Sequence, residues 1–358
     1  MELDKQIQTK KMRSEQNRTE YIDFLRIIAC CMVIFNHSND RGFYRYALCD
    51  IHTIDWVWVT FAAAMCKVGV PIFFMISGAN LIGKTESYGK TFSRSIRIFF
   101  CLLLWSAAYY FIDAKYSPNS FVFLEFIKSF ISGPYWHLWY LYAYIAFIFT
   151  LPFIRAMAAN MHSPELCLMI IIGVLFAVIA PVFENFVIPI CGSWKPSWVI
   201  QQCVLYPVIG YFLGKFDISN MKMKYIFFIC LADFICIFMG VLCEWQYLAV
   251  HPGDKKEMLL WITVFVNAIA IFAATKYLFC KWHCSENIRR IIVKVGKLTF
   301  GIYLMHIMIL WKMPMLLEVW KTIEKLPGGI YVVVVLVFVV SAIITYLMKK
   351  LPIVKKFV

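Results

Sequence analysis

The first long apolar run of the sequence contains two ionisable residues whose spacing could support proton transfer. The run reads YIDFLRIIACCMVIFNHS, and Arg26 and His37 lie eleven residues apart within it. Eleven residues make just over three helical turns, so both side chains fall on nearly the same face, about 16 Å apart along the axis. A neutral histidine there can take a proton from a hydroxyl and return it to a leaving group. Asp23 lies one turn before Arg26 and can neutralise it. The alternative is an interfacial arginine and a structural histidine.

Later apolar runs contain further polar residues, which are costly inside a membrane. His306 falls near the middle of the run KLTFGIYLMHIMIL, and His137 lies among aromatic residues in PYWHLWYLYAYI, at about the depth predicted for His37. His137 could instead belong to an interfacial aromatic belt. Lys67 could pair with an acid or extend to the interface. Ser77 could line a polar cavity or bond to its own helix.

Two arginines precede the third apolar run, in the segment SRSIRIFF. Arg94 and Arg97 are one turn apart near a helix N-terminus, an arrangement that suits a phosphate-rich ligand. The same residues are also what the positive-inside rule places on the cytoplasmic side of a membrane. Spacing alone favours this second interpretation.

One short segment contains residue types that can bind zinc: Cys280, His283 and Cys284. A structural zinc site needs four ligands, and no second pair lies nearby. We therefore predict no metal site.

The elements that must position these residues are membrane helices. Of 358 residues, 62% are hydrophobic and 16% charged, which excludes a disordered chain, a coiled coil and a common soluble enzyme. We expect an all-α polytopic membrane protein with about ten spans. They lie near residues 21–38, 56–82, 95–113, 136–154, 165–183, 198–214, 224–242, 258–276, 296–314 and 330–348. Pro71 and Gly78 are expected to interrupt the second span.

The basic residues predict the orientation of these spans. The net charge is +14, and an inside N-terminus places more than twice as many Lys and Arg in the inner segments as in the outer ones. Both termini are therefore predicted to be cytoplasmic. We expect a polar tail at 1–20, a membrane domain at 21–348 and a basic tail at 349–358. There is no nucleic-acid motif, so no nucleic-acid partner is expected.

Four features in order resemble acyltransferase family 3, a family of bacterial integral-membrane proteins. Arg26 and His37 match its R-x10-H pattern, and PIFFMISG at 71–78 is similar to its second-span signature. Arg94 and Arg97 match an R-x-x-R at the third span, and TFGIYLMH at 299–306 is similar to a late-span signature. The resemblance covers roughly residues 20–348, and the span count agrees with it. Without an extracytoplasmic hydrolase-like domain, the chain resembles the short, stand-alone members.

The resemblance implies an O-acyltransferase of the cell membrane. It would transfer an acyl group, often acetyl, from cytoplasmic acyl-CoA to a hydroxyl of a cell-surface polysaccharide or lipid-linked sugar. His37 would be the catalytic histidine and Arg26 its partner, with Arg94 and Arg97 at the acyl-CoA site. His137, His306, Ser77 and Lys67 remain candidates for acceptor binding or for supporting the site. The partners would be acyl-CoA, the carbohydrate acceptor and membrane lipid, with no tightly bound cofactor.

Two questions stay open at this level. Transfer could be direct or could pass through an acyl-histidine. A transporter of a sugar or other small polar envelope precursor is the competing class, because broken helices and buried ionisable residues also suit exporters. No internal inverted repeat is apparent, which weakens the transporter interpretation.

Overall fold

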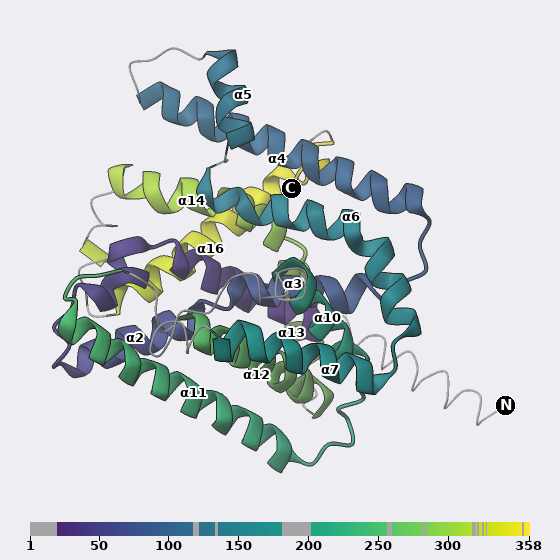
Figure 1. The fold of residues 1–358 in the computed structure, drawn as a ribbon. Coiled ribbons are helices and arrows are strands. Elements are labelled where there is room, and N and C mark those ends of the chain that lie inside the picture. The colour runs from purple at the N-terminus through teal and green to yellow at the C-terminus, as the bar shows by residue number, and fades with distance from the viewer. Residues whose placement is uncertain are drawn as a thin grey trace.

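The structure is a computed structural model. It describes residues 20–116, 122–132, 135–180, 202–255, 260–281, 284–316, 320, 322–323, 326, 328–352 and 354–358, and the regular elements in these ranges are all helical (Figure 1). This confirms the predicted all-α class for the described residues. The principal helices are 20–36, α2 (Ile54–Cys66), α3 (Gly69–Leu81), α4 (Tyr88–Tyr116), α5 (Phe123–Ser132), α6 (Trp139–Asn160), α7 (Ser163–Val174), α10 (Gln202–Lys215), α11 (Met223–Val250), α12 (Leu260–Lys281), α13 (Glu286–Gly296), α14 (Thr299–Leu316) and α16 (Gly329–Met348).

Shorter turns connect some of these helices. They are the 3-10 turns η1 (Asn39–Arg41), η2 (Phe43–Ala47), η3 (Trp136–Leu138) and η6 (Val354–Lys356), and the π-helical segment η4 (Leu175–Ile179). The predicted polar tail lies outside the described residues except for Glu20, and so does the end of the predicted fifth span.

Six helical spans in the described part are long and apolar enough to cross a membrane, and a seventh is added if α13 and α14 count as one span bent by 63°. α7 and the apolar part of α10 are shorter. The predicted count of about ten spans is therefore not confirmed, and the orientation of the termini stays a prediction.

The outer helices present apolar side chains to their surroundings. On α11, Phe227, Phe228, Phe234 and Phe238 are all exposed, and α11 lies at the opposite side of the bundle from α4 (Figure 1). Such a surface would be unfavourable in water but matches lipid. Together with the long apolar helices, it identifies the chain as a multi-pass membrane protein.

The second predicted span breaks at Lys67 and Val68, between α2 and α3. Pro71, four residues after Lys67, has no N–H for the Lys67 carbonyl, and its ring crowds that carbonyl, so the helix is interrupted before the proline. The prediction that Gly78 also interrupts the helix is wrong, because α3 continues through it. A Cβ at Gly78 would lie 1.8 Å from the carbonyl oxygen of Pro207, so glycine there lets the backbones of α3 and α10 touch.

Two further contacts hold neighbouring helices of the bundle together. A Cβ at Gly301 would lie 2.4 Å from the side chain of Thr345, so glycine there lets α16 approach α14 closely. The Lys276 ammonium of α12 donates to the carbonyls of Leu213, Gly214 and Phe216 at 2.6–2.9 Å. It thereby binds the carbonyls at the C-terminal end of α10, which have no partner within their own helix.

Candidate active site

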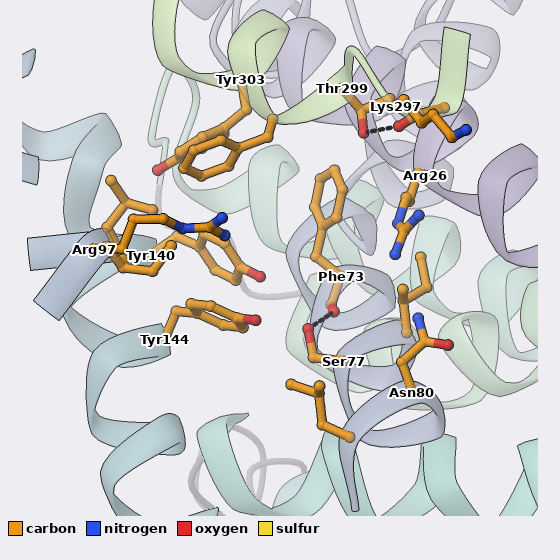
Figure 2. A pocket seen from close by; sticks show the side chains of 16 residues that line it. Arg26, Phe73, Ser77, Asn80, Arg97, Tyr140, Tyr144, Lys297, Thr299 and Tyr303 are labelled. Carbon is orange, nitrogen blue, oxygen red and sulfur yellow. Dashed lines mark hydrogen bonds between the residues drawn. The ribbon is translucent and has the colours of Figure 1, made fainter. Parts of the chain in front are cut away.

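A cavity of about 310 Å³ lies between the helix 20–36, α3, α4, α6 and the α13–α14 junction (Figure 2). Cations and hydroxyl groups from all five elements line it. They are Arg26, Arg97, Lys297, Ser77, Thr299, Tyr140, Tyr144 and Tyr303. We call it the central cavity. A cavity of this composition can hold a polar, negatively charged ligand with an apolar arm.

Arg26 lies on the opposite side of the central cavity from Arg97 (Figure 2). Its Nη1 is 2.6 Å from Oδ1 of Asp23, which confirms the predicted neutralisation across one turn. Ser77 lines the cavity and also donates to the Phe73 carbonyl at 2.8 Å. Both alternatives for Ser77 are therefore confirmed.

The structure brings three histidines from distant parts of the chain together. His37 follows the helix 20–36, His137 lies in η3, and His306 lies on α14. Nδ1 of His37 is 2.7 Å from Nε2 of His306, and the ring of His137 lies 6.2–6.4 Å from the other two, centroid to centroid. All three are buried, with 9%, 2% and 0% of their surface exposed for His37, His137 and His306. We call these residues the histidine cluster.

Hydrogen bonding determines which ring nitrogens carry protons. Nδ1 of His306 is 2.5 Å from the carbonyl oxygen of Tyr303, and a carbonyl can only accept, so this nitrogen is the donor. Nε2 of neutral His306 is therefore an acceptor, and Nδ1 of His37 donates to it. The lone pair of neutral His37 is then on Nε2. His306 thus holds His37 in the tautomer that a general base needs.

Tyr303 links the central cavity to the histidine cluster. Its side chain lines the cavity, its hydroxyl donates to the His137 carbonyl at 2.7 Å, and its own carbonyl accepts from His306. Sequence reasoning did not select Tyr303, although it lies one turn before His306 in TFGIYLMH. Tyr140, Tyr144 and Lys297 were also missed.

Comparison with known families favours one of the two classes left open above. The sequence model of a family described as an acyltransferase domain matches residues 19–347, nearly the whole chain. The chain belongs to acyltransferase family 3. The resemblance found in the four motifs is therefore confirmed, and the protein is a membrane acyltransferase. No curated protein and no solved structure matches the chain.

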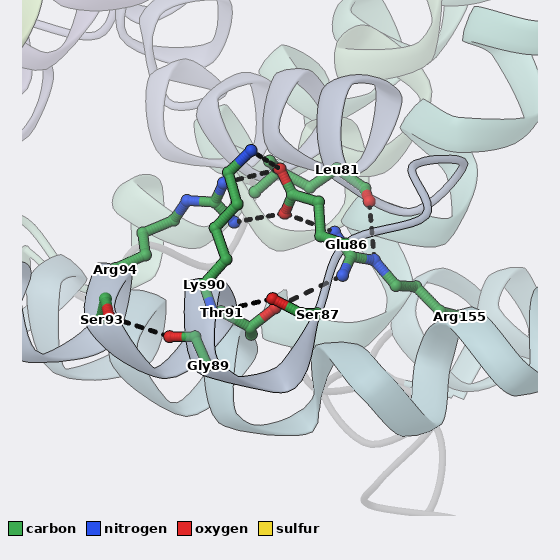
Figure 3. Close-up of polar contacts among 9 residues, drawn as sticks. All are labelled: Leu81, Glu86, Ser87, Gly89, Lys90, Thr91, Ser93, Arg94 and Arg155. Atoms are coloured by element: carbon green, nitrogen blue, oxygen red, sulfur yellow. Dashed lines mark hydrogen bonds and ion pairs between the residues drawn. The ribbon is translucent and has the colours of Figure 1, made fainter.

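The two arginines of the R-x-x-R segment have different environments in the acyltransferase. Arg94 donates through both terminal nitrogens to Glu86 at 3.1 Å, and Arg155 donates to the same carboxylate at 3.0 Å (Figure 3). The hydrogen bond from Arg94, with that from Arg155, lowers the pKa of Glu86 to about 2. Arg97 instead lines the central cavity. The geometry therefore leaves Arg97 available to a ligand, whereas Arg94 is bound to Glu86.

Two other predicted positions lie away from the cavity of the acyltransferase. The Lys67 ammonium is 5.0 Å from the centroid of the Phe43 ring, at the break between α2 and α3. Of the segment with zinc-binding residue types, His283 lies outside the described residues, so the prediction of no metal stays a prediction.

Proposed function

We propose that the protein is an O-acyltransferase of the cell membrane. It transfers an acyl group, most simply acetyl, from acyl-CoA to a hydroxyl of a cell-surface polysaccharide or a lipid-linked sugar. One observation carries this proposal beyond the family assignment. It is the hydrogen-bonded chain from His37 through His306 to the Tyr303 carbonyl, which leaves the lone pair of neutral His37 on Nε2.

In the proposed reaction His37 acts as a general base. Its Nε2 takes the proton of the acceptor hydroxyl while the hydroxyl oxygen attacks the thioester carbonyl. The C–S bond then breaks, and the proton passes from Nε2 to the leaving thiolate, so that the products are the ester and CoA thiol. His306 acts as a positioning residue, because its Nε2 accepts from Nδ1 of His37 and so fixes the tautomer of neutral His37. The same hydrogen bond stabilises the His37 imidazolium that forms when Nε2 takes the proton.

The central cavity is the proposed site of the donor. Arg97, Lys297 and Arg26 supply positive charge on facing walls, and the tyrosine rings supply apolar surface for the pantetheine arm. Arg26 lies within the helix 20–36 and His37 directly after its end, about 16 Å further along the axis. Arg26 therefore lies too far from His37 to contact the reacting carbonyl. Because Arg26 is already paired with Asp23, its part in donor binding is secondary to that of Arg97.

Transfer of label from radiolabelled acetyl-CoA to envelope glycans tests this function. Membranes containing the wild type should label a glycan fraction, and His37→Gln should not, because glutamine cannot shuttle a proton. His52→Gln is the matched control, since His52 is exposed and lies outside the cavity and the cluster. Absence of label in the wild type, combined with altered export of an unmodified envelope precursor, would favour the transporter instead.

A further inference from the structure

A second hollow lies beside the central cavity, between α4 and the segment that follows α16. Its volume is about 650 Å³, and four cations and two aromatic rings line it. They are Arg97, Phe100, Lys349, Lys355, Lys356 and Phe357, and Val358 completes the lining. Arg97 lines the central cavity as well, so the two spaces share one wall residue. We call this second space the C-terminal groove.

Specific contacts hold the lysine-bearing segment against the bundle. The indole nitrogen of Trp105 on α4 donates to the Phe357 carbonyl at 3.3 Å, and the side chain of Val358 is buried. The Lys349 ammonium donates to the carbonyl of Lys297 at the edge of the central cavity. The end of the chain accordingly lies beside α4 (Figure 1). The lysines of the groove therefore have defined positions relative to Arg97.

The side chains that line the groove carry four positive charges. Among the residues that the structure describes, no acidic side chain lines it, and Arg97, Lys349, Lys355 and Lys356 form no ion pair with a carboxylate. Burial, and then the nearby charge of Lys297, lowers the pKa of Lys349. An anion bound here would relieve this repulsion between cations.

We propose that the C-terminal groove binds the nucleotide end of the acyl donor. Its phosphates would lie between Arg97 and the lysines, and its base would pack against Phe100 or Phe357. The inference rests on the proposed function, in which the donor is acyl-CoA. Because Arg97 lines both spaces, the acyl-bearing arm of the donor can continue from the groove into the central cavity towards Tyr303.

The competing occupant is an anionic lipid headgroup, because it also carries phosphate. Three features favour the nucleotide. CoA carries three phosphate groups, which match a cluster of four cations better than the single phosphate of a simple phospholipid does. The groove offers two aromatic rings, against which a base can stack. It also adjoins the cavity in which the rest of the donor is proposed to lie.

The test measures the affinity of the full chain for CoA and for 3′-dephospho-CoA, in nanodiscs of phosphatidylcholine alone. Lys355→Gln combined with Lys356→Gln should weaken CoA binding about ten- to a hundredfold. The same double variant should also discriminate less than the wild type between CoA and 3′-dephospho-CoA. The matched control is Lys294→Gln combined with Lys350→Gln, which removes two exposed charges outside the groove and should change the affinity less than about twofold.

Three results would overturn the proposal without touching the proposed function. They are unchanged CoA affinity in the groove variant, an equal loss of CoA affinity in the control variant, and, in nanodiscs that also contain phosphatidylglycerol, a groove variant that loses only its retention of that lipid. The last would assign the groove to lipid. A wild type that has no affinity for CoA, yet labels glycans from another acyl donor, would instead show that the donor assignment under the proposed function is wrong.

Discussion

Replacing His306 by alanine should lower the rate of acyl transfer without weakening donor binding. His306 has no exposed surface, and its Nε2 lies 2.7 Å from Nδ1 of His37. Without this acceptor, His37 can move its proton to Nε2, which removes the lone pair needed by a base. A positioned general base contributes about 10²–10⁴ in rate, and loss of the correct tautomer costs up to about 10⁴. We therefore expect kcat to fall about 10²–10³-fold, with little change in the KM for the donor.

His306→Gln separates this explanation from simple loss of packing. The glutamine oxygen can reach roughly the position of Nε2 and accept from His37, but it cannot also provide the bond from Nδ1 to the Tyr303 carbonyl. It should therefore restore part of the activity, about tenfold over the alanine variant. If His306 positions His37, the glutamine variant should have a higher activity per folded protein than the alanine variant. If His306 is purely structural, the two variants should differ only in the amount of folded protein.

The assay is steady-state transfer from acyl-CoA in membranes, normalised to folded protein by size-exclusion chromatography with fluorescence detection. His37→Ala combined with His306→Ala should be no slower than His37→Ala alone, because residues that act as a unit are not additive. The reasoning would be refuted by His306→Ala retaining activity within about threefold of the wild type while His37→Ala is inactive. The reasoning would also be refuted if the loss of rate in the double variant equalled the product of the losses in the two single variants.

The remaining predictions concern binding and stability. Arg97→Ala should weaken donor binding about ten- to a hundredfold without lowering thermal stability. Arg94→Ala should leave donor affinity unchanged and lower the unfolding free energy by about 3 kcal/mol. Both quantities are measured on protein in detergent. The lowered pKa of Glu86 stabilises the fold above about pH 4.5, and this contribution should be lost as pH falls towards 2. Wild type and Glu86→Gln should therefore converge in stability over that window, and a parallel decline would contradict the assignment. Gly78→Ala should destabilise the fold by about 3 kcal/mol or more, whereas Gly89→Ala, which has open space, should be near neutral in the same melts.

Local pattern was sufficient to predict the helical class and the main candidate base. The apolar composition requires the backbone to satisfy its own hydrogen bonds, which helices do within one segment. The eleven-residue spacing of Arg26 and His37 depends only on helix geometry, so it could be read before the fold was known. The break in the second span was predictable from Pro71, since the clash with the carbonyl four residues earlier is local. Gly78 was misread because its role is a contact with α10, which no local pattern reveals.

Contacts between distant segments could not be predicted in this way. His37 and His306 are separated by 269 positions in the sequence, and only packing of α14 against the first helix makes them partners. Tyr303 was overlooked for the same reason, because its importance comes from three contacts that meet at one residue. The aromatic residue itself looks like any other member of an apolar run.

The basic residues of the predicted inner side show how one compositional signal covers several physical roles. Positive-inside bias treats Arg94, Arg97 and Lys276 alike. In the structure, Arg94 binds the carboxylate of Glu86, and Lys276 binds the carbonyls at the end of α10. Arg97 instead faces the central cavity and the C-terminal groove, and forms no ion pair in the described part of the chain. A phosphate-bearing donor gains most from cations that the fold has not already paired, because displacing an internal carboxylate would offset the gain. The availability of Arg97, rather than its spacing from Arg94, therefore makes it the stronger donor-binding candidate.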